Sequence, residues 1–308
     1  MKKWVLKAIV QKGISFLPYK HRINYLFQKY ITKGVRLSPL YFEDRLLHLQ
    51  HHLEFYHQYR GDLRSIKTLE LGTGWYPVVP IGLFLAGAGE INTVDISALT
   101  NRENVLLTLK RYLEYESAGK LAPFFIPDPT RLEEARRMVA IADGLDYSQL
   151  LENLRIQYWV MDARQLPLPT ASIQFITSNN TFEHIYPDIL KAILISFKRV
   201  IHPDGVMSHF IDMSDHFAHL DPSISIYHFL RYSNQKWKWI DNDIQPQNRW
   251  RITHYRQLYD TLGIPITKEE NRPGDVAAVK KEPLAEAFKD IPIVDLAISH
   301  SYVVSVGF

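Results

Sequence analysis

A doubly wound α/β fold with a mostly parallel sheet is the fold class that this chain of 308 residues predicts. Residues 66–97 form an apolar strand, a glycine loop, a helix of small and apolar residues, and a second apolar strand. Further apolar runs follow at 156–161, 173–178 and 206–211, and a helical pattern at 187–200 connects the last two. Strands that alternate with helices are typical of a parallel sheet whose crossover helices cover both faces.

The loop after the first strand is the first candidate binding motif. Glu70 ends the strand, and Gly72-Thr73-Gly74 follows. Glycines allow the backbone to turn sharply and to approach a ligand closely. In a loop that binds a pyrophosphate, G-x-G-x-x-G, the third glycine would fall at Pro77, and the Glu70 carboxylate would repel phosphate. The loop therefore suits a cofactor with a ribose and a cationic tail. Taken alone, it could equally be a tight turn without a ligand.

Polar residues at the ends of the following strands extend this candidate site. Asp95, followed by Ile96, ends the second strand, where a carboxylate can accept both hydroxyls of a ribose. Asp162 and Ala163 end the third strand, and Asn179 follows the fourth. The carboxyl ends of parallel strands meet at one edge of the sheet, so these residues are expected to surround one cofactor. Asp162 alone could also be a turn-capping aspartate.

Glu70, Gly72 and Gly74 resemble the first motif of the class I S-adenosylmethionine (SAM) dependent methyltransferases, an acidic residue followed by G-x-G. Tyr76 stands where that family often has a third glycine. Asp95 matches the family's ribose-binding acid. The resemblance implies that Glu70 accepts from the ammonium group of SAM, directly or through water, while the glycine loop passes beneath its methionine and ribose.

Downstream segments continue the resemblance in the family's order. Asp162 and Ala163 match the pair that lies beside the adenine, and the segment 178–185 (SNNTFEHI) resembles the family's segment after the fourth strand. Asn179 would lie under the sulfonium. The resemblance implies an enzyme with SAM as its cofactor and a Rossmann-like sheet of seven strands, six parallel and the last antiparallel. It does not cover residues 1–60, 117–154 or 213–260.

Composition excludes several classes of protein. The net charge of +3, without a long basic block, argues against a nucleic-acid partner. The absence of cysteine excludes disulfides and thiolate chemistry. No apolar run approaches the roughly 20 residues of a membrane span, and the basic N-terminus lacks a signal cleavage site. We expect a cytoplasmic protein.

Two domains are predicted, a helical N-terminal cap at 1–60 and a catalytic domain at 61–308 with insertions at about 117–154 and 213–260. Leu46, Leu49, Leu53 and Tyr56 recur at helical spacing within the cap. The first helix combines apolar residues with lysines, so it is expected to pack on its own domain or, alternatively, to contact a membrane surface or a partner helix. A homodimer is a further possibility. Further elements are predicted at 98–115 and 131–142 (helices) and at 301–308 (a strand).

A run of histidines and aspartates follows the fifth strand. Asp215-His216 and His219-Asp221 both pair an imidazole with a carboxylate, which is the usual arrangement of a general base for a hydroxyl. His216 is the first candidate for this base, with Asp215 and His219 beside it. The same run could bind a metal or could simply be a polar loop exposed to solvent.

Glu183 and His184 form a second candidate set. In some quinone-type O-methyltransferases of the superfamily, the corresponding residues hold a divalent cation, but here Asn180 replaces one of the acids. We therefore predict no metal, with His184 as a further catalytic candidate. Alternatively, Glu183 and His184 brace the loop. Three further histidines are expected to face solvent or to be hydrogen-bonded within a helix: His48, His51 and His52.

The acceptor is predicted to be small or medium-sized. Aromatic residues of the 213–260 insertion, with Arg231, Arg249 and Arg251, would line its pocket, or else the rings form the insertion's own core. The predicted reaction is methyl transfer to a hydroxyl or carboxyl oxygen of a natural product, sugar or peptide. Alternatives are a small-molecule N-methyltransferase, an NAD-dependent oxidoreductase or epimerase, an aminopropyl transferase and a non-catalytic partner subunit.

Overall fold

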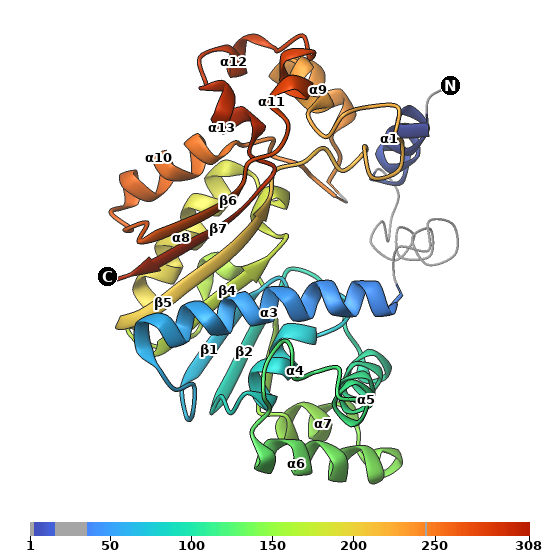
Figure 1. The fold of residues 1–308 in the computed structure, drawn as a ribbon, viewed down its shortest axis with the longest axis vertical. Helices are drawn as coiled ribbons and strands as arrows, with labels where there is room; N and C mark the ends of the chain where they lie inside the picture. Colours follow the sequence, from blue (N-terminus) through green and yellow to red (C-terminus); the bar gives the residue numbers. More distant parts are fainter. Residues whose placement is uncertain (1–2, 16–35, 244) are drawn as a thin grey trace. The chain divides into compact units, whose positions relative to one another are not determined.

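The computed structural model describes residues 3–15, 36–243 and 245–308 (Figure 1). The basic Lys2 and the middle of the predicted cap, 16–35, lie outside the described residues. Contacts divide the described chain into two compact units. We call residues 36–179, 192–209 and 304–308 the motif unit, because they contain the predicted cofactor motifs. The insertion unit comprises the remaining described residues, at 3–15, 180–191 and 210–303.

Seven strands within the described ranges form one sheet, in the order β3-β2-β1-β4-β5-β7-β6 (Figure 1). Six strands are parallel and the last is antiparallel, so the predicted Rossmann-like fold is confirmed. In the centre, β1 pairs in parallel with β2 and β4, which places Glu70 opposite Thr93 and Thr177. The strands are β1 (Lys67–Leu71), β2 (Glu90–Asp95), β3 (Ile156–Val160), β4 (Ile173–Asn179), β5 (Ile201–Asp212), β6 (Lys268–Arg272) and β7 (His300–Val306).

The motif unit places its helices around β1, β2, β3 and β4. Helix α4 contacts β2, α7 contacts β3, and α5 and α6 pack on each other and on α4. The helices are α3 (Pro39–Arg60), α4 (Val78–Leu85), α5 (Arg102–Ser117), α6 (Pro129–Ala140) and α7 (Tyr147–Asn153), and the crossover helix α8 (Pro187–Val200) connects β4 to β5. Side-chain N-capping explains where two of these helices, α5 and α6, begin. The Asn101 side chain accepts from the Asn104 N–H, and the Asp128 side chain accepts from the N–H groups of Thr130 and Arg131.

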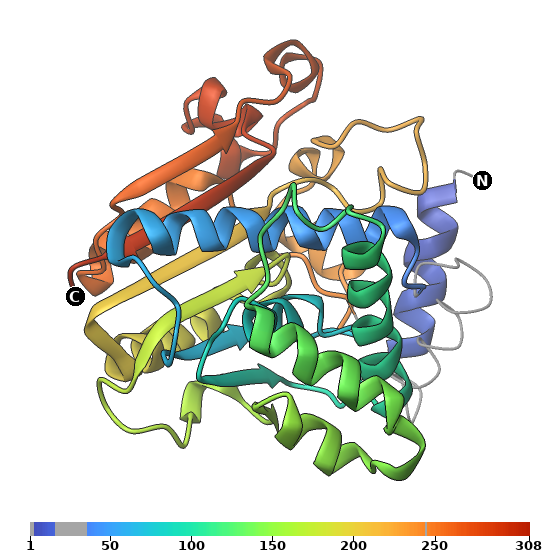
Figure 2. The same cartoon turned by 60° about the horizontal axis from the view of Figure 1, so that its bottom comes forward.

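Helix α3 packs against α4 and β4 (Figures 1 and 2). The predicted stripe of Leu46, Leu49, Leu53 and Tyr56 is buried, as the helical spacing indicates. His52, predicted on a solvated or satisfied face, is fully buried and hydrogen-bonded. Because α3 contacts the motif unit and α1 (Lys3–Ser15) contacts the insertion unit, the described parts of the predicted cap belong to different units.

The insertion unit has its own apolar core. Phe217, Tyr227, Phe229 and Trp237 pack with residues of α1 and of the segment 279–297. The aromatic residues therefore form mainly a core, which was one of the two predicted possibilities, although Trp239 is 80% exposed. The helices of this unit, besides α1, are α9 (Asn234–Ile240), α10 (Ile252–Leu262), α11 (Val276–Lys280), α12 (Glu286–Lys289) and α13 (Ile293–Ala297).

The arginines predicted near an acceptor have structural partners instead. Arg251 is fully buried and donates to the backbone carbonyl of Leu296 at 2.7 Å, and to those of Met213 and Ile298. Arg249 donates to the carbonyls of Phe229 and Tyr232 and lies over the Trp237 ring, while Arg231 pairs with Glu282. These side chains hold the insertion unit together, because a buried guanidinium needs several acceptors.

Candidate active site

The glycine loop adopts a backbone that favours glycine. Gly72 and Gly74 have φ angles of 87° and 66°, in the left-handed region where a Cβ is strained. The N–H of Gly72 donates to the Val94 carbonyl at 2.8 Å, and the N–H of Gly74 donates to the Asp95 carboxylate at 3.1 Å. The first and second motifs are thus connected directly through the backbone of the loop.

Glu70 lies buried directly before this loop. Burial raises its pKa to about 8, although a hydrogen bond from the Thr93 hydroxyl, 3.2 Å from Oε2, works in the opposite direction. Thr73, which the sequence places among the cofactor contacts, has its hydroxyl hydrogen-bonded to Thr93. A carboxyl group that is costly to ionise gains most from a cationic ligand, so Glu70 suits an ammonium group.

Asp95 is held by backbone donors on both carboxylate oxygens. Oδ2 accepts from Gly74, and Oδ1 accepts from the Ser97 N–H at 3.1 Å. Burial raises the pKa of Asp95, and these hydrogen bonds lower it again. Ile96, the neighbouring predicted contact, is 72% exposed.

Asp162 caps a short 3₁₀ turn, Ala163–Gln165, which was the alternative interpretation of its sequence position. Its carboxylate accepts from the Arg164 N–H at 2.9 Å and from the Arg164 guanidinium. The hydrogen bond with Arg164 lowers the pKa of Asp162 below its usual range. Ala163 is buried. Arg164 was not among the predicted site residues, although a cation two residues after an aspartate is visible in the sequence.

Asn179, at the end of β4, is 8% exposed. Its side-chain oxygen lies 2.9 Å from Nε2 of His52, which comes from α3. Sequence reasoning missed this partner, because 127 residues separate the two positions. The predicted contacts Glu70, Gly74, Asp95 and Asn179 all belong to the motif unit.

The predicted catalytic residues belong to the insertion unit, and His216 has a different partner from the predicted one. Nε2 of His216 lies 3.2 Å from Oδ2 of Asp212, the last residue of β5. Asp215 instead lies 3.6 Å from His228 and accepts from the Phe217 N–H. The predicted Asp215–His216 pair is therefore corrected to Asp212–His216, since the chain turns after β5 and directs Asp215 toward His228.

Asp212 also contacts His300, whose Nε2 lies 3.3 Å from Oδ1. Burial would raise the pKa of Asp212, but the hydrogen bond and charge of His216, with the charge of His300, lower it well below its usual range. Asp212 precedes His216 by four residues, so this spacing in the sequence could have indicated the pair. His300 was missed because only the sheet brings β7 beside β5.

His184 and His219 flank His216. The ring centroid of His184 lies 4.9 Å from that of His216, and the ring of His219 stacks on His216 at 5.3 Å. Burial lowers the pKa of His184 to about 4, and burial also lowers the pKa values of His219 and His300. The predicted His219–Asp221 pair is not observed, because Ser214 lies 3.3 Å from His219 and Asp221 accepts from the Trp4 N–H.

Glu183, His184 and His216 could also hold a metal ion, because one ligand atom from each lies within 4.8 Å of the others. Nδ1 of His184 donates to the Pro246 carbonyl at 2.6 Å, which leaves its Nε2 with a lone pair. Two imidazoles and a carboxylate are ligands that zinc and similar metals accept. The absence of a metal therefore stays a prediction.

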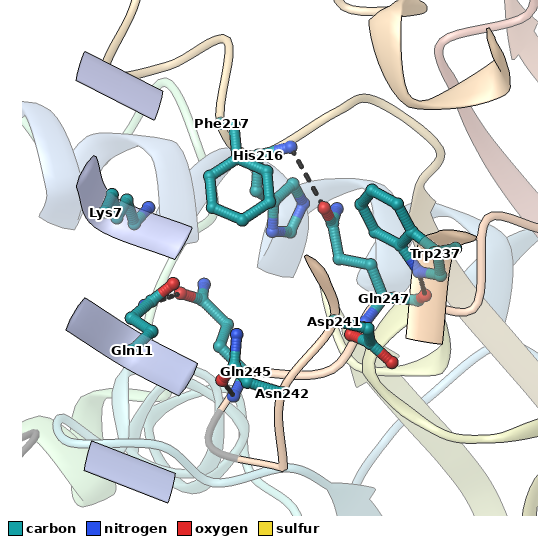
Figure 3. Close-up of a pocket in the computed structure, with 9 residues that line it drawn as sticks. All are labelled: Lys7, Gln11, His216, Phe217, Trp237, Asp241, Asn242, Gln245 and Gln247. Carbon is teal, nitrogen blue, oxygen red and sulfur yellow. Dashed lines mark hydrogen bonds between the residues drawn. The ribbon is translucent and has the colours of Figure 1, made fainter. Parts of the chain in front are cut away.

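A pocket lies beside His216 within the insertion unit (Figure 3). Its empty volume is about 250 Å³, including space open to solvent. Gln247 connects the pocket to the histidine loop, because its Oε1 accepts from the His216 N–H at 3.4 Å and its Nε2 donates to the Ser214 carbonyl at 3.1 Å. The lining residues are Lys7, Gln11, His216, Phe217, Trp237, Asp241, Asn242, Gln245 and Gln247.

A family profile described as a methyltransferase domain matches residues 128–208. That range contains the predicted cofactor contacts Asp162, Ala163 and Asn179. The comparison with curated proteins gives no match. None of the helices in the described ranges is long and apolar enough to cross a lipid bilayer.

Several solved structures are similar to the chain. A protein from Pyrococcus horikoshii OT3 has a TM-score of 0.47 at 14% identity, covering 92% of this chain and 98% of that one. Phosphoethanolamine N-methyltransferase 2 from Haemonchus contortus, in complex with S-adenosyl-L-methionine, has a TM-score of 0.44 at 13% identity, covering 83% and 52%. A SAM-dependent methyltransferase from Aquifex aeolicus has a TM-score of 0.42 at 10% identity, covering 89% and 100%. Identities this low carry no information on the substrate.

Proposed function

We propose that this chain is a class I SAM-dependent methyltransferase that methylates an oxygen of a small or medium-sized acceptor, with His216 as the general base. The matched methyltransferase domain, the order of the motifs and the order of the strands support the family and its cofactor, SAM. The acceptor class and the base are the finer parts of the proposal.

The cofactor contacts are proposed from the motif unit. Glu70 would accept from the ammonium group of SAM, Asp95 from the ribose hydroxyls and Asp162 from the adenine amino group, while Ala163 would donate to the adenine ring. Gly72, Thr73 and Gly74 would border the methionine, with Ile96 against the adenosine and Asn179 beside the sulfonium. The left-handed glycines, the buried carboxylate of Glu70 and the half-buried carboxylate of Asp95 support this proposal.

The Asp212–His216 pair is the observation that carries the proposed base. In methyl transfer the acceptor oxygen attacks the methyl carbon, the carbon–sulfur bond breaks with its electrons going to sulfur, and the acceptor proton must leave. We place the proton of His216 on Nε2, which lies 3.2 Å from Asp212, so that Nδ1 would have the lone pair that takes the acceptor's proton. The Asp212 carboxylate then stabilises the imidazolium that forms.

The neighbouring imidazoles support the assignment to His216. Burial lowers the pKa values of His184, His219 and His300, so these side chains are neutral at pH 7 and do not repel a charge on His216 strongly. His184 and His219 would then shape the site rather than take the proton. Asp215, whose partner is His228, has no role as the carboxylate of the base in this proposal.

The residues beside His216 suggest the chemistry of the acceptor. Phe217 and Trp237 offer ring surfaces, and Gln11, Asn242 and Gln245 offer amides. Rings and amides together suit a ring compound that carries hydroxyl groups, such as a sugar or a natural-product intermediate.

The test is methyl transfer from labelled SAM into the small-molecule fraction of a cell extract. His216→Ala is expected to lower the rate by about 10²-fold, because a positioned base contributes about that factor, while calorimetric SAM affinity stays near that of the wild type. His202→Ala is the matched control, since His202 is a half-exposed histidine near Asp204, at 3.9 Å. An unchanged rate for His216→Ala would show that the base is another group.

A further inference from the structure

Two buried histidine–serine pairs lie in the motif unit, one between α3 and β5 and the other between β4 and β5. His52, from α3, lies with Nδ1 at 2.7 Å from the Ser208 hydroxyl and with Nε2 at 2.9 Å from the Asn179 side-chain oxygen. His52 and Ser208 are fully buried, and Asn179 is nearly so. The three side chains thus form a continuous buried chain from β5 through α3 to the end of β4.

The direction of these hydrogen bonds follows from the groups themselves. An amide oxygen can only accept, so Nε2 of His52 carries the proton and donates to Asn179. Nδ1 then has the lone pair and accepts from the Ser208 hydroxyl. The Ser208 hydroxyl, which can donate or accept, completes the hydrogen bonds of this His52 tautomer, and His52 in turn holds the Asn179 amide oxygen.

The second pair joins the adjacent residues of the same strands. Nδ1 of His209 lies 2.8 Å from the Ser178 hydroxyl, and the His209 ring stacks on Phe197 of α8 at 6.0 Å. Successive side chains of a strand point to opposite faces, so this pair lies across the sheet from Asn179. It has the same chemistry and burial as the first pair, and it makes a matched control.

We propose that His52 is a positioning residue for the cofactor, which holds the Asn179 amide in the orientation that SAM requires. The inference rests on the proposed contact between Asn179 and the cofactor. Neither His52 nor Ser208 belongs to the glycine loop or to a strand-end motif, so the proposal extends the cofactor machinery to α3.

The histidine suits this role because it stays neutral. Burial lowers the pKa of His52 to about 4, and the hydrogen bond to Asn179 offsets this only in part. Between pH 5 and pH 9 the ring therefore donates one fixed hydrogen bond. A lysine or arginine at this site would bring an uncompensated buried charge.

The test measures calorimetric affinity for S-adenosylhomocysteine (SAH), which needs no knowledge of the acceptor. His52→Leu is expected to weaken SAH binding about 10-fold, since a buried acceptor loses its donor. His52→Gln is expected to stay within about threefold of the wild type, because its amide nitrogen reaches the position of Nε2. Ser208→Ala, which keeps the ring and removes the hydrogen-bond partner of its Nδ1, is expected to weaken binding by a smaller factor, and Ser178→Ala is expected to leave it unchanged.

The double variant separates positioning from general loss of structure. If His52 acts through Asn179, His52→Leu adds no further loss of SAH affinity in an Asn179→Ala background. Additive losses, or a Ser178→Ala effect equal to that of Ser208→Ala, would overturn the inference while leaving the Asn179 contact intact. Unchanged SAH affinity in Asn179→Ala alone would overturn the proposed contact itself, and the inference with it.

Discussion

The backbone N–H of Gly74 donates to the Asp95 carboxylate across 3.1 Å, so the glycine loop after β1 and the acid that ends β2 form one structural unit. This hydrogen bond places one oxygen of Asp95 against the loop, and Ser97 holds the other. A change in the loop backbone is therefore expected to move the proposed ribose acceptor as well.

Gly74→Ala tests this coupling. Gly74 has a φ of +66°, and a Cβ there would meet open space, so the cost of alanine is conformational rather than steric. A residue with a Cβ in this region costs about 1–2 kcal/mol, and asparagine tolerates it better than alanine. We expect a lower unfolding free energy and weaker SAH binding for Gly74→Ala, with Gly74→Asn closer to the wild type, as measured by urea unfolding and calorimetry. Equal losses for both variants would contradict the conformational explanation.

The raised pKa of Glu70 predicts a pH dependence of cofactor binding. The ammonium group of SAH favours the ionised carboxylate, and burial keeps Glu70 protonated below about pH 8. Binding must then release a proton, so SAH affinity is expected to rise from pH 6.5 to pH 8.5, by up to about 10-fold per unit below the pKa. Calorimetry in buffers of different ionisation enthalpy measures both the affinity and the proton release. In Glu70→Gln both effects should disappear, and a pH dependence that persists there would assign it to another group.

The same shift predicts the sign of a stability effect. Because the folded-state pKa of Glu70 lies above its unfolded value, the folded protein binds more protons between about pH 4.5 and pH 8. This group's contribution to the unfolding free energy is thus fully present below about pH 4.5 and is lost as the pH rises through 8. Comparing urea unfolding of the wild type and Glu70→Gln at pH 6 and pH 9 measures it. If the unfolding free energy fell less from pH 6 to pH 9 in the wild type than in Glu70→Gln, the raised pKa of Glu70 would be contradicted.

Local sequence patterns predicted the parts of the fold and site that depend on neighbouring residues. The glycine loop and the acids at strand ends follow from strand periodicity and from residues within a few positions of each other, whereas the seven-stranded sheet was implied by the resemblance to the methyltransferase family. Asp128 caps a helix near its predicted start because capping is a local interaction. The predicted start at 98 was wrong, since Asn101 caps α5 and the helix begins at Arg102. Asp162 shows the limit of local patterns, because an aspartate at this position is compatible both with capping a turn and with contacting a ligand.

Partners distant in sequence could not be predicted. His300 contacts Asp212 because β7 lies next to β5 in the sheet, and His52 reaches Asn179 because α3 packs on β4. The wrong partner for His216 has another cause. Adjacent residues in sequence, such as Asp215 and His216, point in different directions after a strand, whereas a residue four positions earlier can face the ring. Buried arginines were misassigned because a sequence does not show which carbonyls converge on them.

The corrected partner of His216 predicts different effects for two nearby aspartates. Asp212→Asn keeps the size of the side chain but removes the charge that stabilises an imidazolium, so methyl transfer is expected to fall at least 10-fold with SAH affinity unchanged. Asp215→Asn disturbs the contact with His228 and is expected to lower the unfolding free energy, with a much smaller effect on the rate per folded molecule. Rates of both variants, normalised to the folded fraction, check the prediction. A larger fall in the methyl-transfer rate for Asp215→Asn than for Asp212→Asn would indicate that Asp215 is the partner of the base.

Metal removal distinguishes the two uses that the histidine cluster allows. Glu183, His184 and His216 bring ligand atoms within 4.8 Å, yet an imidazole whose lone pair binds a metal cannot accept the acceptor's proton. Since His216 is the proposed base, chelation with EDTA followed by dialysis is expected to leave methyl transfer unchanged, and metal analysis is expected to find less than one equivalent bound. Glu183→Gln, which removes a ligand without touching the Asp212–His216 pair, serves as the comparison. The opposite result would be activity that is lost with EDTA and restored by zinc or cobalt, with a cobalt d–d absorption that Glu183→Gln abolishes. It would show that the cluster is a metal centre and that His216 is not the base.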